Sequence, residues 1–479
     1  MSDKAVSSAA RQRITALLDE NSFVEIGGQI TARSTDFNLQ EQETPSDGVI
    51  TGYGVIDGNP VYVYSQDVSV LNGTIGEMHG RKIVRLYQSA MKLGVPVIGL
   101  LDCAGIRLQE STDALNALGE IYKSQAMASG VIPQITAVFG NCGGGLAMVA
   151  GMSDFTFMEE TKGRLFVNAP NAIDGNEISR CDTSSAAYQS QETGLVDVKG
   201  TQEEILEKMR DLIGMLPPNY EDGPDYGECT DDLNRVCGDI ESCAEDGVLA
   251  ISRIADDQLF LEIKADYGKD MAAGFIRLNG ATVGAVANCC KRYDADGNPV
   301  ENSGNVISSR GAKKAARFVR FCDAYGIPVL TLTNVRGYKS TKCAENNMAE
   351  AVSSLTYAFA QATVPKVNVI IKEAYGSAYA VMNSKALGAD MVYAWPDAKV
   401  GMMDAGTAAK IMYEKDGIDV INEKARQYEK LQNNVLSAAR RGYVDAVIAP
   451  EDTRKYVIAA FEMLFTKRED TPRKKHGTI

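Results

Sequence analysis

Residues 94–107 read G-V-P-V-I-G-L-L-D-C-A-G-I-R, and residues 326–339 read G-I-P-V-L-T-L-T-N-V-R-G-Y-K. Two further related stretches follow them, P-Q-I-T-A-V-F-G-N-C-G-G-G-L-A-M at residues 133–148 and P-K-V-N-V-I-I-K-E-A-Y-G-S-A-Y-A at residues 365–380. One offset of 232 residues carries Pro96 onto Pro328, Gly105 onto Gly337, Pro133 onto Pro365, Gly144 onto Gly376, Lys82 onto Lys314 and Arg85 onto Arg317. Self-similarity at a fixed period is typical of a duplicated unit, so the sequence predicts two copies of one domain.

Each copy alternates apolar strands with helices. A hairpin opens each copy, because Asp57-Gly58 and Asn279-Gly280 separate two runs of strand-forming residues. A helix, an apolar strand, a second helix and another apolar strand then follow. The first helix and the two strands are expected at 80–92, 95–101 and 135–139 in one copy, and at 311–325, 327–332 and 367–371 in the other. Such alternation predicts an α/β fold with a mostly parallel sheet covered by helices.

The domain boundaries follow from composition. The span 217–245 is rich in Pro, Gly, Asp, Glu and Cys, which predicts a connector. The N-terminal domain is then expected at residues 11–216 and the C-terminal domain at residues 246–479. A chain of 479 residues is long enough for two domains with separate cores.

The charge balance argues against nucleic acid as a partner. The formal net charge is -14, and an acidic surface repels phosphate backbones. The polar start Met-Ser-Asp-Lys lacks the apolar core of a secretory signal, and no run of eighteen apolar residues occurs. We therefore expect a soluble cytoplasmic protein, with attachment to the edge of a membrane complex as the alternative.

Cysteine and histidine usage makes a metal site an unfavoured interpretation. None of the ten cysteines forms a C-x-x-C pair, and Cys229, Cys237 and Cys243 have no nearby fourth ligand. The only histidines are His79 and His476. The sequence therefore predicts no bound metal and leaves His79 as the single candidate for a histidine base.

Candidate binding residues lie where the predicted parallel strands end, because ligands of open α/β sheets bind beyond the strand C-termini. Both copies place a glycine-rich turn there, around Gly144 and around Gly376. Glycine lets backbone N–H groups converge at a helix N-terminus, which suits a phosphate or a developing oxyanion. Close backbone packing is the structural alternative. Recurrence of the turn in both copies favours the functional interpretation.

Two other chemistries compete for nearby residues. The run G-N-C-G-G at 140–144 has the spacing of a nucleophile elbow with Cys142 as the thiol. The repeat partner of Cys142 is Ala374, so the turn recurs without a thiol, which disfavours that mechanism. The stretch A-M-K at 90–92 is similar to a biotinylation site, but Lys92 lies at the end of a predicted helix, where the macrodipole favours a cation.

Several motifs resemble those of the carboxyltransferase (β-type) subunits of biotin-dependent acyl-CoA carboxylases and decarboxylases. In the first copy they are S-Q-D (65–67), G-T-I-G-E-M-H-G (73–80), D-C-A-G-I-R-L-Q-E (102–110) and S-D-F-T-F-M (153–158). In the second copy they are K-A-A-R-F-V-R-F-C-D-A (314–324), A-T-V-P-K-V (362–367) and M-N-S-K (382–385). The resemblance runs from about Arg11 to the C-terminus. The family includes propionyl-CoA carboxylase β, transcarboxylase, and subunits of methylmalonyl-CoA and glutaconyl-CoA decarboxylases.

The resemblance implies two tandem crotonase-like domains and a hexamer built as a trimer of dimers. In the family, the active site forms between the N-domain of one subunit and the C-domain of another. Acyl-CoA lies against the N-domain and biotin against the C-domain. This sequence contains no biotin-carrying hairpin and no ATP-grasp pattern, so biotin is expected on a separate carrier protein, supplied by a biotin carboxylase or by membrane decarboxylase subunits.

The resemblance also implies roles for individual residues. Backbone amides of Gly144 and Gly145 would face the thioester oxygen, and those of Ser377 and Ala378 would face the ureido oxygen of biotin. Substrate-binding residues would be Cys103, Ala104, Gly105, Arg107, Gly143, Gly376 and Ala380. Three regions depart from the family pattern. The loop Val335–Thr341 lacks the usual prolines, Cys103 and Ala104 replace Ser-Gly, and Ala380 stands where propionyl-preferring relatives often carry Asp.

The sequence thus predicts a biotin-dependent carboxyltransferase acting on a short acyl-CoA, with propionyl-CoA and methylmalonyl-CoA as the expected pair. One alternative is the same subunit in a sodium-pumping decarboxylase. Two others are a biotin-independent hydratase or thioesterase, and a scaffold subunit without turnover, which the altered Val335–Thr341 loop motivates.

Overall fold

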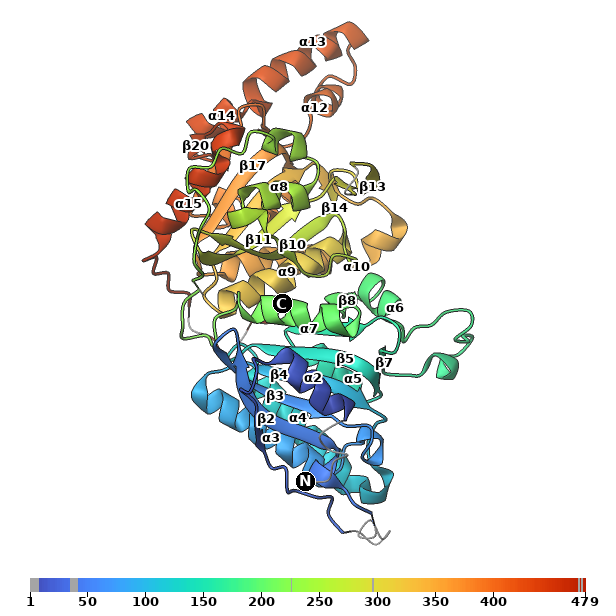
Figure 1. The fold of residues 1–479 in the computed structure, drawn as a ribbon. Coiled ribbons are helices and arrows are strands. Elements are labelled where there is room, and N and C mark those ends of the chain that lie inside the picture. Colours follow the sequence, from blue (N-terminus) through green and yellow to red (C-terminus); the bar gives the residue numbers. More distant parts are fainter. Residues whose placement is uncertain (1–7, 35–41, 225, 295–296, 473, 475–476) are drawn as a thin grey trace. The chain divides into compact units, whose positions relative to one another are not determined.

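The computed structural model describes residues 8–34, 42–224, 226–294, 297–472, 474 and 477–479. The chain divides into two compact units, Met1–Gly223 and Pro224–Ile479 (Figure 1). His476, one of the two histidines, lies outside the described residues. No helix within the described ranges is both long and apolar enough to span a membrane.

The first unit is built on one mixed sheet. Its strands are β1 (Val24–Ile26), β2 (Val49–Ile56), β3 (Asn59–Gln66), β4 (Val97–Cys103), β5 (Gln134–Gly143), β6 (Phe155–Glu159), β7 (Arg164–Phe166) and β8 (Val198–Gly200). The strand order is β1-β2-β3-β4-β5-β6-β8, with β7 paired to β5. The β2–β3 hairpin is antiparallel and turns at Asp57 and Gly58, as predicted, and the sheet is parallel from β3 onward.

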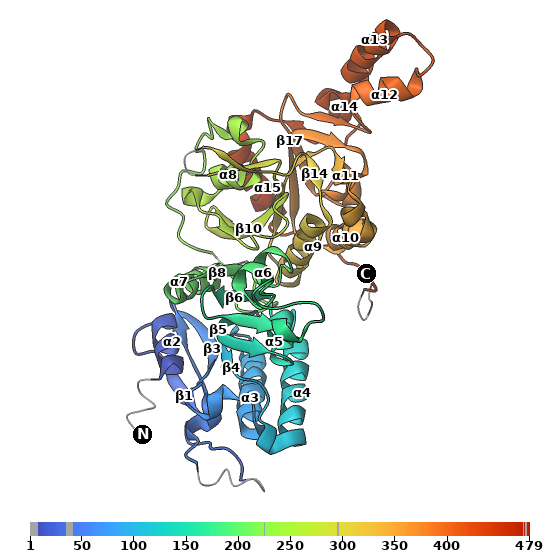
Figure 2. The ribbon, with the colours of Figure 1, turned by 90° about the vertical axis from the view of Figure 1, so that its right-hand side faces the viewer.

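Helices cover both faces of this sheet (Figure 2). They are α2 (Ala9–Leu17), α3 (Glu77–Leu93), α4 (Ser111–Ala128), α5 (Leu146–Met152), α6 (Ala186–Gln191) and α7 (Gln202–Ile213). Helices α3 and α4 pack together, as do α2 and α7. The core under α3 and α4 contains Val97 and Leu101 of β4 together with Leu86 and Leu118 of the two helices. Their burial removes apolar surface from water, the main force that holds the unit together.

The second unit repeats this sheet. Its strands are β9 (Leu261–Glu262), β10 (Met271–Leu278), β11 (Ala281–Asn288), β15 (Val329–Val335), β17 (Lys366–Tyr375), β18 (Met391–Ala394), β19 (Lys399–Gly401) and β20 (Ala446–Val447). The order is β9-β10-β11-β15-β17-β18-β20, with β19 paired to β17. Every strand has a counterpart in the same place in the first unit. The predicted internal repeat and the α/β fold are therefore confirmed.

Additional elements complete the second unit. The helices are α8 (Gly247–Ile254), α9 (Ser309–Ala324), α10 (Lys342–Gln361), α11 (Gly376–Val381), α12 (Ala405–Met412), α13 (Ile418–Tyr428), α14 (Val435–Arg440) and α15 (Thr453–Leu464). The short strands are β12 (Lys291–Tyr293), β13 (Pro299–Asn302), β14 (Val306–Ile307) and β16 (Gly337–Tyr338). Helices α8 and α15 pack on one face, where Val367, Val369 and Ile371 of β17 join their core. Helices α12 and α13 project away from the sheet (Figure 2).

A buried lysine recurs in both units. Lys82 of α3 donates to the carbonyl oxygens of Ser46, at 2.9 Å, and Val49. Its repeat partner Lys314 of α9 donates to the carbonyl oxygen of Lys264 at 2.8 Å. A buried ammonium is tolerated only when hydrogen bonds replace its lost water. In both copies this lysine therefore ties the first long helix to the segment that precedes the hairpin.

The predicted connector is divided between the two units, and most of it belongs to the second. The units divide between Gly223 and Pro224, and residues from the later part of 217–245 are buried in the core under α8, among them Cys237, Ile240 and Cys243. The boundaries at 216 and 245 stay predictions.

Candidate active site

The two glycine-rich turns share one backbone conformation. Strand β5 ends at Gly143 and is followed by Gly144 with φ +61°, and β17 ends at Tyr375 and is followed by Gly376 with φ +62°. This left-handed region costs an L-residue roughly 1–2 kcal/mol, whereas glycine adopts it freely. Both turns open a helix, α5 in the first unit and α11 in the second. The repeat therefore extends to the geometry of the turn itself.

Each glycine of the first turn is required for a different reason. A Cβ at Gly143 would lie 2.7 Å from the ring of Phe166, and one at Gly144 would meet open space but require the left-handed φ. A Cβ at Gly145 would lie 2.8 Å from the hydroxyl of Tyr122 and 2.9 Å from the side chain of Leu118. The bare backbone of this turn therefore faces close neighbours on several sides.

The amides of the first turn are not equivalent. The Gly144 N–H donates to the carbonyl oxygen of Phe166 at 2.9 Å, because the β5–β7 pairing continues into the turn. In the described part of the chain the Gly145 N–H has no hydrogen-bond partner. Of the two amides predicted to face an oxyanion, the structure thus leaves that of Gly145 available and engages that of Gly144.

The second turn presents Ser377 and Ala378 in the first turn of α11, where backbone N–H groups face outward from a helix N-terminus. Ser377 and Ala380 are exposed, whereas the side chain of Ala378 is buried. A Cβ at Gly376 would lie 3.2 Å from the carbonyl oxygen of Met402. By the 232-residue offset, Ser377 and Ala378 correspond to Gly145 and Leu146.

The predicted acyl-CoA loop lies beside the first turn, because Cys103 at the end of β4 pairs with Cys142 of β5. Ala104 is exposed and Gly105 is half-buried with φ +117°, so both present backbone to the surface. Cys103 is buried, and burial raises the pKa of its thiol to about 11. The sequence predictions therefore meet at one edge of the sheet.

Arg107 anchors this loop to the interior of the first unit. Its guanidinium is buried and lies 2.6 Å from a carboxylate oxygen of Asp47 and 2.7 Å from one of Glu110. It also donates to the carbonyl oxygen of Thr74 at 2.9 Å. These partners engage the guanidinium within the protein, so Arg107 holds the loop in place, and its contact with substrate stays a prediction. The sequence motif located this arginine but did not reveal Asp47, which is sixty residues away in the chain.

Cys142 lacks the surroundings of a nucleophile. It is fully buried in the core, and burial raises the pKa of its thiol far above the ordinary range. A thiol attacks only as the thiolate, which this environment disfavours. His79 is also buried, with Nδ1–H donating to the Asp47 carbonyl oxygen at 3.0 Å and Nε2 accepting from Gln66 at 3.3 Å. Cys142 and His79 are therefore both part of the packed interior of the first unit.

We expect the Cys142→Ala variant to keep carboxyltransferase turnover within about threefold of wild type. Alanine already occupies the equivalent position, Ala374, which is fully buried. Loss of the sulfur should lower the free energy of unfolding by about 1 kcal/mol. Steady-state rates and a melting curve would check both statements. Complete loss of activity in a folded variant would revive a thiol mechanism.

We expect His79 to make stability depend on pH. Burial lowers its pKa from 6.5 to about 3 in the folded protein. Between these values the unfolded chain binds a proton that the folded chain does not, so the free energy of unfolding falls as the pH drops below 6.5. The slope for one proton is at most about 1.4 kcal/mol per pH unit. Urea unfolding at pH 7 and pH 5.5 should show a smaller decrease in His79→Gln than in wild type; equal decreases would contradict this assignment.

The altered loop of the second unit is held by its own contacts. Strand β16 pairs with β14, and the Arg336 guanidinium lies 3.2 Å from a carboxylate oxygen of Glu373. The side-chain amide of Asn305 donates to the same carboxylate at 2.9 Å. An ion pair and a short parallel ladder thus stand where the family pattern has prolines.

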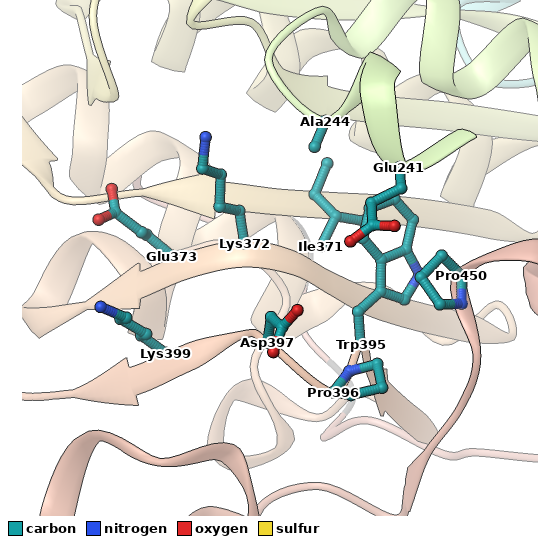
Figure 3. A pocket seen from close by; sticks show the side chains of 10 residues that line it. All are labelled: Glu241, Ala244, Ile371, Lys372, Glu373, Trp395, Pro396, Asp397, Lys399 and Pro450. Carbon is teal, nitrogen blue, oxygen red and sulfur yellow. The ribbon is translucent and has the colours of Figure 1, made fainter. Parts of the chain in front are cut away.

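A pocket of about 340 Å³ opens beside the C-terminal end of β17 (Figure 3). Its floor is apolar, with Ile371 and the Trp395 ring, and its rim carries charges of both signs. Lys372 and Glu373 belong to this lining, whereas Ser377 and Ala378 do not. Lys372 is paired with Glu245 at 2.9 Å. The pocket therefore neighbours the second turn without containing it.

The described residues contain no group of three or more His, Cys, Asp or Glu placed to hold a metal ion. Cys237 and Cys243 are buried among apolar residues, and burial raises the pKa of both thiols.

Comparison with known proteins connects this arrangement to one family. Residues 4–479 match the carboxyl transferase domain. The propionyl-CoA carboxylase beta chain of Roseobacter denitrificans is 39% identical over 98% of this chain and 93% of its own length. The methylmalonyl-CoA decarboxylase subunit alpha of Propionigenium modestum is 37% identical over 98% of this chain and 92% of its own length. The structure of transcarboxylase 12S, a hexamer solved with hydrolysed methylmalonyl-CoA bound, superimposes with a TM-score of 0.92 at 32% identity, covering 98% of this chain and 92% of that one. Both units of the chain have the crotonase-like fold of transcarboxylase 12S. The chain therefore belongs to the carboxyl transferase family.

Proposed function

We propose that this protein is the carboxyltransferase subunit of a biotin-dependent enzyme that moves a carboxyl group between carboxybiotin and the α-carbon of propionyl-CoA. The observation that carries the proposal is the doubled turn, with φ +61° at Gly144 and +62° at Gly376, each between a parallel strand and a helix. During carboxyl transfer, negative charge develops on two oxygens, one on each substrate. Two preorganised sets of N–H donors would stabilise these two charges.

The first turn is proposed to serve the acyl-CoA. When the α-carbon gives its proton to the biotin ring that has lost its carboxyl group, negative charge would grow on the thioester oxygen, and a fixed N–H aimed at that oxygen would lower the barrier by about 3–4 kcal/mol. The Gly145 N–H has no competing protein acceptor among the described residues, so it needs no rearrangement before it binds the oxyanion. Exposed Ala104 and half-buried Gly105, beside this turn, are proposed to bind the CoA ester.

The second turn is proposed to serve biotin. Biotin supplies a carboxyl group carried on its ureido ring and a ring oxygen that becomes negatively charged. The amides of Ser377 and Ala378, at the start of α11, would bind that oxygen, and left-handed Gly376 lets the ring approach the backbone. Exposed Ala380 is proposed to help select the acyl group.

The assembly and partners are proposed from the relatives. A hexamer like that of transcarboxylase 12S would combine the acyl-CoA turn of one copy with the biotin turn of another. A separate biotin carboxyl carrier protein would deliver biotin, together with a biotin carboxylase in a cytoplasmic enzyme. The second candidate function is decarboxylation in a membrane complex, which the similarity to the methylmalonyl-CoA decarboxylase subunit supports.

The test is incubation of the purified chain with methylmalonyl-CoA, with and without free biotin and with a biotinylated carrier, while propionyl-CoA is followed by mass spectrometry. Biotin-dependent loss of the carboxyl group supports carboxyl transfer. Release of free CoA and methylmalonate without formation of propionyl-CoA and without a need for biotin favours a thioesterase instead, and biotin-independent addition of water to an enoyl-CoA favours a hydratase. If malonyl-, ethylmalonyl- and glutaconyl-CoA also give no product with the carrier, the scaffold alternative replaces the proposal.

A further inference from the structure

Tyr122 connects α4 to the first glycine turn. Its hydroxyl donates to the carbonyl oxygen of Gly145 at 2.5 Å. The same oxygen accepts from the Met148 N–H at 3.2 Å, as the first turn of α5 requires. A helix-terminal carbonyl thus receives a second, side-chain donor that regular helix geometry does not supply.

This contact belongs to a pair. One turn further along α4, the side-chain amide of Gln125 donates to the carbonyl oxygen of Val149 at 3.0 Å. Residues three apart lie on the same helix face, and so do residues four apart, so the two donors hold two successive turns of α5. Leu118, buried on the same face of α4, packs against the position where a Gly145 side chain would begin.

The Tyr122 contact has a consequence for the neighbouring amide. The Gly145 carbonyl and the Leu146 N–H belong to one planar trans peptide, in which the two groups point in opposite directions. A hydroxyl that fixes the carbonyl therefore also fixes the direction of the Leu146 N–H. Hydrogen bonding to a peptide oxygen further polarises its N–H as a donor. Leu146 is the repeat partner of Ala378, one of the two amides proposed to serve biotin.

We propose that Tyr122 is a positioning residue of the acyl-CoA turn, whose hydroxyl orients the Gly145–Leu146 peptide so that the Leu146 N–H joins that of Gly145 as the second oxyanion donor. The proposal rests on the proposed function and names a residue that the motifs do not reveal. The second turn lacks this contact, because the offset places Ser354 at the position of Tyr122, and the Ser354 hydroxyl accepts from Arg320 at 3.0 Å.

The experiment compares wild type with Tyr122→Phe, which removes only the hydroxyl. We expect kcat for carboxyl transfer to fall about tenfold, equal to about 1.4 kcal/mol, with KM for the acyl-CoA changed less than twofold. We also expect weaker binding of a dethia-CoA carboxylate, in which a carboxylate oxygen stands where the enolate oxygen forms. Binding of propionyl-CoA, whose thioester group is uncharged, should not change. An oxyanion donor acts on the charged species and hardly on the neutral one.

Two control variants separate positioning from stability. Tyr53→Phe makes the same substitution at an exposed tyrosine of β2 and should leave the rate and both affinities unchanged. Gln125→Met removes the structural partner of the pair; it should lower the melting temperature while keeping the ratio of the two affinities. The proposal would be overturned if Tyr122→Phe had the wild-type kcat, or if it bound both ligands more weakly by the same factor.

The ratio of the affinity for the dethia-CoA carboxylate to the affinity for propionyl-CoA also distinguishes this inference from the proposed function. If wild type transfers no carboxyl group but binds the carboxylate more tightly than propionyl-CoA, the proposed function fails. A ratio reduced in Tyr122→Phe would then still support the role of Tyr122. If wild type does not prefer the carboxylate, the turn holds no oxyanion and the assignment of Tyr122 fails with it.

Discussion

The Gly145→Val variant is expected to lose carboxyltransferase activity by about a hundred- to a thousandfold, the effect of removing one oxyanion donor. A side chain at this position would start 2.8 Å from the Tyr122 hydroxyl and 2.9 Å from Leu118, so both neighbours must move. The branched Cβ would also cover the amide that the structure leaves available. The loss should appear in kcat more than in KM, because the lost interaction forms as charge develops.

The chain offers a matched control in Gly119→Val. Gly119 lies on the exposed face of α4, and a Cβ there would meet nothing within 4 Å. That variant should keep its activity, since it carries the same added volume without touching the turn. Overpacking against Leu118 should reduce the stability of Gly145→Val by about 1–3 kcal/mol, which a thermal melt would detect. A folded Gly145→Val variant with near-normal kcat would remove the first turn from the mechanism.

The fold was accessible from the sequence because its signals are local and duplicated. The Asp57-Gly58 and Asn279-Gly280 turns predicted both hairpins, and the structure confirms both as antiparallel strand pairs. The boundaries were less exact. Strand β5 runs on to Gly143 rather than ending at residue 139, because the added pairing with β7 extends its ladder beyond the apolar run. Apolar patterning reports burial, whereas strand length also depends on a partner distant in sequence.

The candidate site was predicted only in part, for a related reason. The glycine turns were visible as motifs, but which amide stays unpaired depends on Phe166, which β7 brings alongside β5. Tyr122 gave no sequence signal, since a tyrosine at helical spacing is typical of a packed face. The motif located Arg107, but its burial depends on Asp47, which lies just before the β2–β3 hairpin and 2.6 Å from the Arg107 guanidinium.

Arg107→Ala is expected to lower the free energy of unfolding by about 3–5 kcal/mol, the largest stability effect predicted for a single substitution in this chain. The substitution would leave the carboxylates of Asp47 and Glu110 buried without their shared cation, since their side chains are fully inaccessible. Neither carboxylate can regain water without opening the loop that carries Ala104 and Gly105. Activity should therefore fall together with stability.

Comparison with an exposed arginine tests whether burial is the cause. Arg33 also pairs with two carboxylates, those of Glu77 and Asp113, but 47% of its side-chain surface is exposed. Arg33→Ala should therefore cost no more than about 1 kcal/mol, because water replaces the lost partner. Arg107→Lys should lie between the two, since an ammonium keeps the charge but cannot reach both carboxylates and the Thr74 carbonyl in the planar geometry of a guanidinium. If urea unfolding gave equal losses for Arg107→Ala and Arg33→Ala, the buried cluster would not be what holds the acyl-CoA loop in place.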